Sequence, residues 1–269
     1  YALYTSSVSY LTTSQIEALE TRDVAVLRFE NLEALNSAQV QALNTAQVEA
    51  LTSTQIKGLN STFVSSLTTQ QLLAIQSTKL NLLDVGSIAA LTSTQVIGYS
   101  TTQIAALSNA TLELLNTLSV AALLTEQIAA LTTSQAYSLT EKTIKAFTSE
   151  QIGALSTSAI NVLTYENLAA LNTDQVQGLT TDQIAALSTK QVYYFNTATL
   201  SSLTTNQIAA LETRDVAVLT NDNILALKTE QLQALSSSQI AILSSVQLKV
   251  LTTSQVAGLS TQQVFEMNT

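Results

Sequence analysis

The 269-residue chain contains no cysteine, histidine, proline or tryptophan, and it has only six glycines. Without Cys or His it lacks disulfides, thiolate zinc sites, haem ligation by these residues, and Cys or His groups for nucleophilic or base catalysis. Only ten Lys and Arg residues oppose 19 Asp and Glu residues, so the net charge is −9. A nucleic-acid backbone requires clustered basic side chains. We therefore expect no enzyme, no cofactor, no metal site and no nucleic-acid partner.

Long apolar runs are also missing. Hydrophobic residues make up 46% of the chain, but Thr, Ser, Gln or Asn interrupt them in every stretch of eight residues. A membrane-spanning helix needs roughly 18 or more consecutive apolar residues. We expect no membrane insertion.

What the chain does have is an eight-residue period. From Leu3 onward every eighth residue is Leu, with the exceptions Ile75, Tyr99, Phe147, Phe195 and Met267. Residues 3–266 form 33 complete octads without an insertion or deletion, and a typical octad is LTTDQIAA at residues 179–186. In such an array each unit buries its apolar face against its neighbours. Because composition does not shift, we predict one continuous octad-repeat solenoid over residues 1–269, and we expect it to be a fragment of a longer array.

Each octad carries the signals of a short helix. Position 2 is Thr, Ser, Asn or Asp in 26 of 33 octads, and position 5 is Gln in 19, as in Thr180 and Gln183. A small polar residue followed three residues later by Gln is a capping box, in which each residue satisfies a backbone amide of the other. Leu at position 1 and Ile or Val at position 6 are spaced for a hydrophobic staple. We predict one capped helix of about five or six residues per octad.

Two other folds compete with this prediction. In a single long helix the apolar stripe would drift by about 80° per octad, which no supercoil can follow. A β-solenoid is the better alternative, since Thr, Val and Ile favour strands. Against it stand the paired Ala and Leu residues and the lack of Pro and Asn-Gly turns. We predict an all-α solenoid and keep the β-solenoid as the alternative.

A slower period runs inside the octads. The octads that lack Gln at position 5 form groups three or four octads apart, and the string ALETRDVAVL occurs at residues 18–27 and again at 210–219. The two copies are 192 residues, or 24 octads, apart and seven groups apart, which predicts about 3.4 octads per superhelical turn. One side of the solenoid would then bear a contact line with a neighbouring chain, although duplication of an ancestral block would leave the same trace. The residues predicted for this line are Asp23, Asn31, Phe63, Lys79, Thr111, Asn167, Thr199 and Asp215.

Two further groups of residues stand out. Asp174 and Asp182 occupy the same position in adjacent octads, and we read them as solvated charge rather than calcium ligands. Tyr193, Tyr194 and Phe195 form the densest aromatic cluster. This cluster is either a surface contact or a variant of the core, and both interpretations stay open.

Octads such as LTTDQIAA resemble the LTTxQIAAL arrays of very large bacterial surface proteins of the adhesin or haem-utilisation type. The resemblance covers essentially the whole chain and implies a structural stalk at the cell surface. We therefore expect an extracellular rod, stalk or fibre subunit that associates with itself or with neighbouring chains of a surface assembly. The alternative is a binding module that grips a peptide, a glycan or a sister chain through one specialised face.

Overall fold

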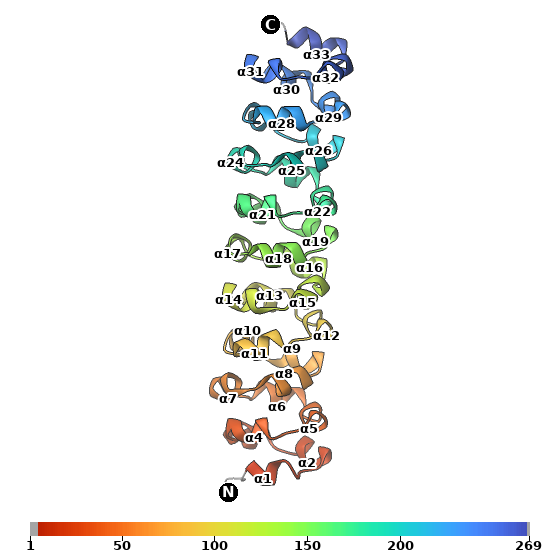
Figure 1. The fold of residues 1–269 in the computed structure, drawn as a ribbon. Helices are drawn as coiled ribbons and strands as arrows, with labels where there is room; N and C mark the ends of the chain where they lie inside the picture. The colour runs from red at the N-terminus through yellow and green to blue at the C-terminus, as the bar shows by residue number, and fades with distance from the viewer. Residues whose placement is uncertain (1–4, 268–269) are drawn as a thin grey trace. The chain divides into compact units, whose positions relative to one another are not determined.

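The computed structural model describes residues 5–267 and has two compact units, residues 1–135 (unit 1) and residues 136–269 (unit 2). Within the described residues every regular element is a short α-helix and no strand occurs, so the predicted all-α class is confirmed and the β-solenoid is not adopted. Figure 1 shows the helices succeeding one another along the chain.

The helices follow the octads one by one. In unit 1 they are α1 (Thr5–Val8), α2 (Thr13–Glu17), α3 (Thr21–Val26), α4 (Phe29–Glu33), α5 (Ser37–Gln41), α6 (Thr45–Glu49), α7 (Ser53–Gly58), α8 (Ser61–Ser66), α9 (Thr69–Ala74), α10 (Ser77–Leu80), α11 (Val85–Ala89), α12 (Ser93–Val96), α13 (Thr101–Ala106), α14 (Asn109–Leu114), α15 (Thr117–Ala122) and α16 (Thr125–Ala129). The boundary between the units falls within α17 (Thr133–Tyr137). In unit 2 they are α18 (Glu141–Ala146), α19 (Ser149–Ala154), α20 (Thr157–Val162), α21 (Tyr165–Ala169), α22 (Thr173–Gly178), α23 (Thr181–Ala185), α24 (Thr189–Tyr193), α25 (Thr197–Ser202), α26 (Thr205–Ala209), α27 (Thr213–Ala217), α28 (Asn221–Ala226), α29 (Thr229–Ala234), α30 (Ser237–Ala241), α31 (Ser245–Lys249), α32 (Thr253–Gly258) and α33 (Thr261–Glu266).

Capping boxes start most of these helices. Thr180, the N-cap of α23, has extended backbone angles, φ −76° and ψ 160°. Its hydroxyl accepts from the Gln183 amide at 3.2 Å, and the Gln183 Oε1 accepts from the Thr180 amide at 2.8 Å. Because the chain becomes extended again at the next Leu, such as Leu179 after α22, each helix ends within its own octad. The predicted capping box is confirmed.

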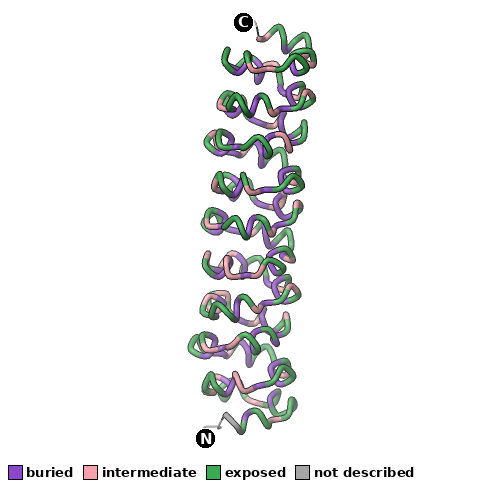
Figure 2. Tube along the Cα trace, viewed as in Figure 1, coloured by how far each residue is buried: buried purple, intermediate pink, exposed green. Residues whose placement is uncertain are grey.

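The core of each unit consists of positions 1 and 6 of the octads. Ile184 at position 6 and Leu187 at position 1 are both fully buried. Figure 2 shows this alternation of buried and exposed residues along the trace. Where an aromatic residue replaces Leu, as at Tyr99 and Phe147, it is also buried, and burial raises the pKa of the Tyr99 phenol. Burial of these apolar side chains supplies the main favourable free energy of folding.

The superhelical turn is visible in long-range hydrogen bonds. Gln47 Nε2 in unit 1 donates to the carbonyl oxygens of Ile16 at 2.9 Å and Leu19 at 2.7 Å, which lie 31 and 28 residues earlier. In unit 2 Gln183 Nε2 donates across the same separations to Ile152 and Leu155. A separation of 28 residues is 3.5 octads, close to the predicted 3.4. Accordingly each helix packs against the helix three further along, as α19 does against α22.

One of these helix pairs approaches unusually closely. A Cβ atom added at Gly153 in α19 would lie 2.7 Å from the carbonyl oxygen of Gly178 in α22, and a Cβ at Gly178 would collide with the Ser149 backbone. Neither glycine has a positive φ angle. Both glycines therefore serve the packing of turn on turn, not an unusual backbone conformation.

Candidate functional site

The most regular polar feature of both units is a line of position 5 side chains buried between successive turns, which we call the glutamine seam. Each seam glutamine has two partners. Its oxygen accepts from the N-cap amide of its own helix, and its Nε2 donates to backbone carbonyls 28 and 31 residues earlier, as in Gln207 with Leu179 at 2.7 Å and Val176 at 2.8 Å. A carbonyl left without a donor in such a buried place would cost roughly 1 to 3 kcal/mol. The seam therefore satisfies the ends of one turn with side chains of the next.

Several residues that replace glutamine in the seam preserve this bond. Ser87 and Ser119 donate their hydroxyls to the carbonyls of Leu59 and Leu91 at 2.8 and 2.7 Å. Asn167 and Asn223 donate to Leu139 and Phe195, and Lys79 Nζ donates to Leu51 at 2.7 Å. In each pair the acceptor lies 28 residues before the donor. Sequence analysis identified only the capping half of the position 5 role, because its second partner is distant in the chain.

The residues of the predicted contact line take their places in this seam. Six of them are buried, namely Asn31, Phe63, Thr111, Asn167, Thr199 and Asp215. Lys79 is half-buried and only Asp23 is exposed. The surface placement we expected for the line is therefore corrected: a side chain enclosed between turns cannot reach a neighbouring chain. Replacement of glutamine changes how a turn is joined to the one before it.

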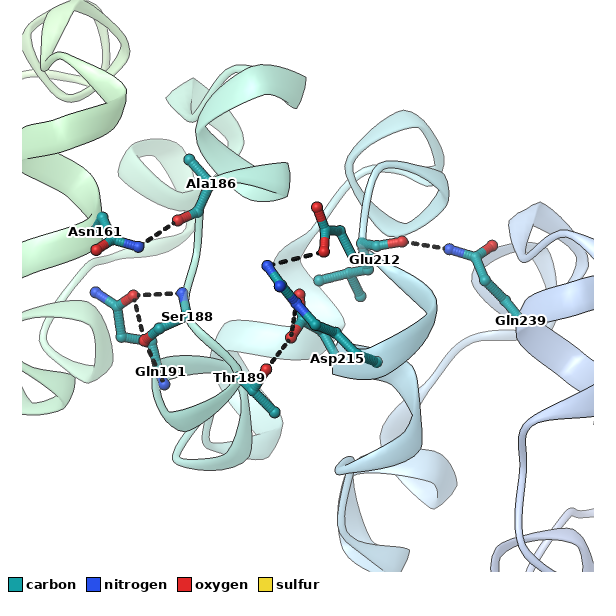
Figure 3. A network of polar contacts seen from close by, with 10 residues as sticks. Asn161, Ala186, Ser188, Thr189, Gln191, Glu212, Asp215 and Gln239 are labelled. Atoms are coloured by element: carbon teal, nitrogen blue, oxygen red, sulfur yellow. Dashed lines mark hydrogen bonds and ion pairs between the residues drawn. The ribbon is translucent and has the colours of Figure 1, made fainter.

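Asp215 is the exception among the buried seam residues because it carries a carboxylate. Its side chain is 0% exposed, the Thr189 hydroxyl donates to its Oδ1 at 2.9 Å, and Arg214 Nε lies 3.7 Å from the same oxygen. Its Oδ2 has no hydrogen-bond partner. Burial raises the pKa of Asp215 above its usual range, although the Thr189 hydroxyl and Arg214 oppose the shift. Figure 3 shows the carboxylate between Thr189 and the Arg214 side chain, which also pairs with Glu212 at 2.8 Å.

The aromatic cluster divides between surface and core. Phe195 is buried at position 1, whereas Tyr193 and Tyr194 are exposed. The Tyr194 ring stacks on Tyr165 with centroids 4.5 Å apart, and Tyr193 meets it edge-on at 5.1 Å. Both interpretations of the cluster therefore hold for part of it.

Beside these rings lies an open groove of about 530 Å³ in unit 2. Tyr137, Asn161, Tyr165, Glu166 and Lys190 are among the side chains that line it. The groove combines aromatic surface with hydrogen-bonding groups of both charges. It is the one feature of the candidate sites that could hold a ligand of some length.

Metal and membrane sites are not found in the part of the chain that the structure describes. Over residues 5–267 no three His, Cys, Asp or Glu side chains come together as metal ligands. Asp174 and Asp182 are both exposed. None of the described helices has the length and apolar character needed to cross a bilayer.

The repeat can be compared with known families at this point. The model of the ALTTAQ repeat matches residues 24–61, 162–189 and 208–245. The chain is a repeat protein similar to the ALTTAQ repeat. Its matched segments include ALNTAQ at residues 42–47, which runs from position 8 of one octad through the cap to the seam glutamine of the next. The ALTTAQ-like segments occur in both units. No curated protein matches the chain.

Proposed function

We propose that this protein is a structural spacer, a stalk whose stacked turns hold attached parts at a set separation. The observation that carries the proposal is the glutamine seam, which joins each turn to the one before it by buried side-chain to backbone hydrogen bonds. Neutral, short and fully enclosed, these bonds are not weakened by salt as surface ion pairs are. A chain built in this way resists stretching at every turn, which is what a spacer needs.

The place of the spacer is the second part of the proposal. We propose that it belongs to an extracellular assembly on a bacterial cell, as part of an adhesin-type surface protein. Three features support this: the resemblance to LTTxQIAAL arrays, the absence of oxidisable cysteine, and the net charge of −9, which keeps a repetitive chain soluble. Association with neighbouring chains stays a proposal without the predicted contact line, since that line is buried.

Spacing is tested by varying the number of turns. Blocks of 56 residues, which are seven octads and two turns, are added between a surface anchor and a fluorophore, and the height of the fluorophore is measured by energy transfer. The height of a spacer should grow in proportion to the number of blocks. A flexible chain grows only as the square root of its length, so a Gly/Ser linker with the same number of residues is the control. Square-root growth of the repeat blocks would contradict the proposal.

The surface location is tested separately. Intact cells of the source organism are treated with a protease that cannot enter them, and the protein is followed with an antibody. A surface spacer is cleaved while an internal marker protein is spared. Full protection on intact cells, with cleavage after lysis, would place the spacer inside the cell.

A further inference from the structure

Three exposed tyrosines in unit 2 recur at the length of the superhelical turn. Tyr137, Tyr165 and Tyr193 are spaced 28 and 28 residues apart, the same separation that the seam hydrogen bonds span. They are exposed by 66%, 42% and 50%. Each therefore lies one turn beyond the last, and we call the three residues the tyrosine column. Figure 1 shows α17, α21 and α24, which carry them, succeeding one another on one side of the ribbon.

The middle of the column is held in place by its neighbours. The Tyr165 ring stacks on Tyr194 at 4.5 Å with an interplanar angle of 25°. A hydrogen bond with Glu166 raises the pKa of the Tyr165 phenol and lowers that of the Glu166 carboxyl. A ring fixed on one face and at its hydroxyl loses little freedom when a ligand covers its other surface. Exposed aromatic rings that are ordered in this way are typical of binding surfaces.

The groove beside the column determines what kind of ligand fits. Tyr137 and Tyr165 both line it, so the rings of two successive turns face one open space. Lys190 and the tyrosine hydroxyls bring hydrogen-bond donors to the same space. The ligand should therefore be elongated, present apolar surface once per turn of the solenoid, and carry free acceptors between these surfaces.

A polyproline II helix has these properties. It repeats every three residues with a rise of about 3.1 Å each, hence about 9 Å per turn, and its carbonyl groups have no internal partners. Stacked helices are about 8 to 10 Å apart, so successive tyrosines would meet the same edge of such a peptide on each of its turns. Aromatic grooves bind this conformation in several unrelated domains. Residues 1–269 contain no proline, so the ligand comes from outside this sequence.

We propose that the tyrosine column binds a proline-rich segment of another protein in the polyproline II conformation, one peptide turn for each turn of the solenoid. The inference is independent of the spacer function. It would let a stalk anchor a second protein along its side.

The test uses the whole 269-residue chain and a fluorescently labelled decaproline peptide, followed by anisotropy. A Gly/Ser decapeptide with the same label, which lacks the polyproline II preference, is the peptide control. The variants are Tyr137→Ala and Tyr165→Ala, and Tyr10→Ala in unit 1 is the matched control because Tyr10 is 85% exposed and lies outside the column. We expect saturable binding of decaproline that weakens by about tenfold or more in the two column variants. Tyr10→Ala should bind as the unaltered chain does.

Tyr137→Ala keeps the test decisive if loss of the Tyr165 stack disturbs the fold, since Tyr137 is largely exposed; thermal melts check both variants. The proposal is overturned if decaproline does not saturate the chain by about 1 mM, or if it binds no better than the Gly/Ser peptide. It is also overturned if Tyr10→Ala weakens binding as much as Tyr137→Ala. Binding of cellohexaose that depends on Tyr137, with no binding of decaproline, would assign the column to a glycan instead.

Discussion

At the residue scale, glutamine at position 5 is the side chain on which the repeat depends. An uncharged amide offers an acceptor and two donors on one flexible arm, so it can serve the N-cap amide and a distant carbonyl together. Asn and Ser keep the distant bond at some positions, as Asn167 and Ser119 do. A carboxylate has no hydrogen to donate, and this difference gives two predictions.

The first prediction concerns Gln183→Glu. Glutamate preserves the acceptor for the Thr180 amide but removes the donor to the carbonyls of Ile152 and Leu155, and it places a negative charge beside two carbonyl oxygens. We expect the free energy of unfolding at pH 7 to fall by about 3 kcal/mol, measured by urea denaturation. Gln177→Glu is the control, because Gln177 is exposed, and it should change little. Equal losses in the two variants would show that the seam bond does not contribute.

The second prediction concerns Asp215→Asn. Asparagine can donate to the preceding turn, as Asn223 does, and it removes a buried charge whose Oδ2 has no partner. We expect a gain of about 1 to 3 kcal/mol at pH 7, reduced slightly by the lost attraction of a carboxylate for the helix N-terminus. Asp23→Asn is the matched control, since Asp23 lies in an identical decapeptide but is exposed.

The gain from Asp215→Asn should depend on pH. Because the pKa of Asp215 is raised on folding, the folded state holds this proton more tightly than the unfolded state. The unaltered chain therefore loses stability as the pH rises from the ordinary value of 3.8 to the raised folded value, and the loss is constant above it. Thermal melts should show a large difference between variant and unaltered chain at pH 7 and a smaller one near 3.8. A difference that grows as the pH falls would contradict the assignment.

At the element scale, the helices are too short to persist without their surroundings. Helices of four to six residues lie far below the length at which an isolated helix forms in water. Each is stabilised by its cap and by packing against the helix three further along. Some caps lack a side-chain acceptor, among them Leu124 before α16 and Lys228 before α29.

The third prediction repairs one of these caps. In Leu124→Thr the new hydroxyl can accept from the Gln127 amide, while Gln127 Oε1 already accepts from the Leu124 amide at 2.7 Å. We expect the free energy of unfolding to rise by about 1 kcal/mol, less a small term for the exposed apolar surface that is lost. Leu118→Thr, within α15 and highly exposed, is the control and should be neutral or slightly destabilising. If the control is stabilised equally, capping is not the cause.

At the scale of the whole molecule, two periods have to be satisfied together. The capped helix repeats every eight residues, and the seam joins residues 28 apart, which is 3.5 octads. The shortest length that contains whole numbers of both is 56 residues. Changes in chain length should therefore be tolerated or not according to whether they preserve the octad register.

The fourth prediction tests this with two deletions in unit 1. Removing residues 43–98 joins Ala42 to Tyr99, so a position 8 residue still precedes a position 1 residue. Removing residues 43–70 joins Ala42 to Gln71 and shifts the register by half an octad. We expect the 56-residue deletion to keep the helical circular dichroism per residue and a single sharp melt. The 28-residue deletion should melt lower and more broadly, although it removes fewer residues. The opposite order would show that the octad register does not limit the fold.

The sequence by itself determined the elements. Caps, staples and helix ends depend on residues within one octad, so Thr180, Gln183 and Leu187 could be interpreted without knowing any other part of the chain. The length of the turn was also within reach, because stacked positions vary together and leave a slow period in the sequence. What local pattern could not supply was the distant partner of each seam side chain, and this is why the predicted contact line proved to be largely buried.

Only the tertiary structure decided which side chains are enclosed. The decapeptide ALETRDVAVL occurs twice, yet Asp23 in its first copy is exposed and Asp215 in its second is fully buried. Residue 215 has a turn of chain 28 residues before it, and residue 23 has none. The same separation aligns Tyr137, Tyr165 and Tyr193, which look unrelated in the octads because they occupy positions 7, 3 and 7. Burial and alignment are properties of stacked turns, so identical residues acquire different environments from the turns that cover them.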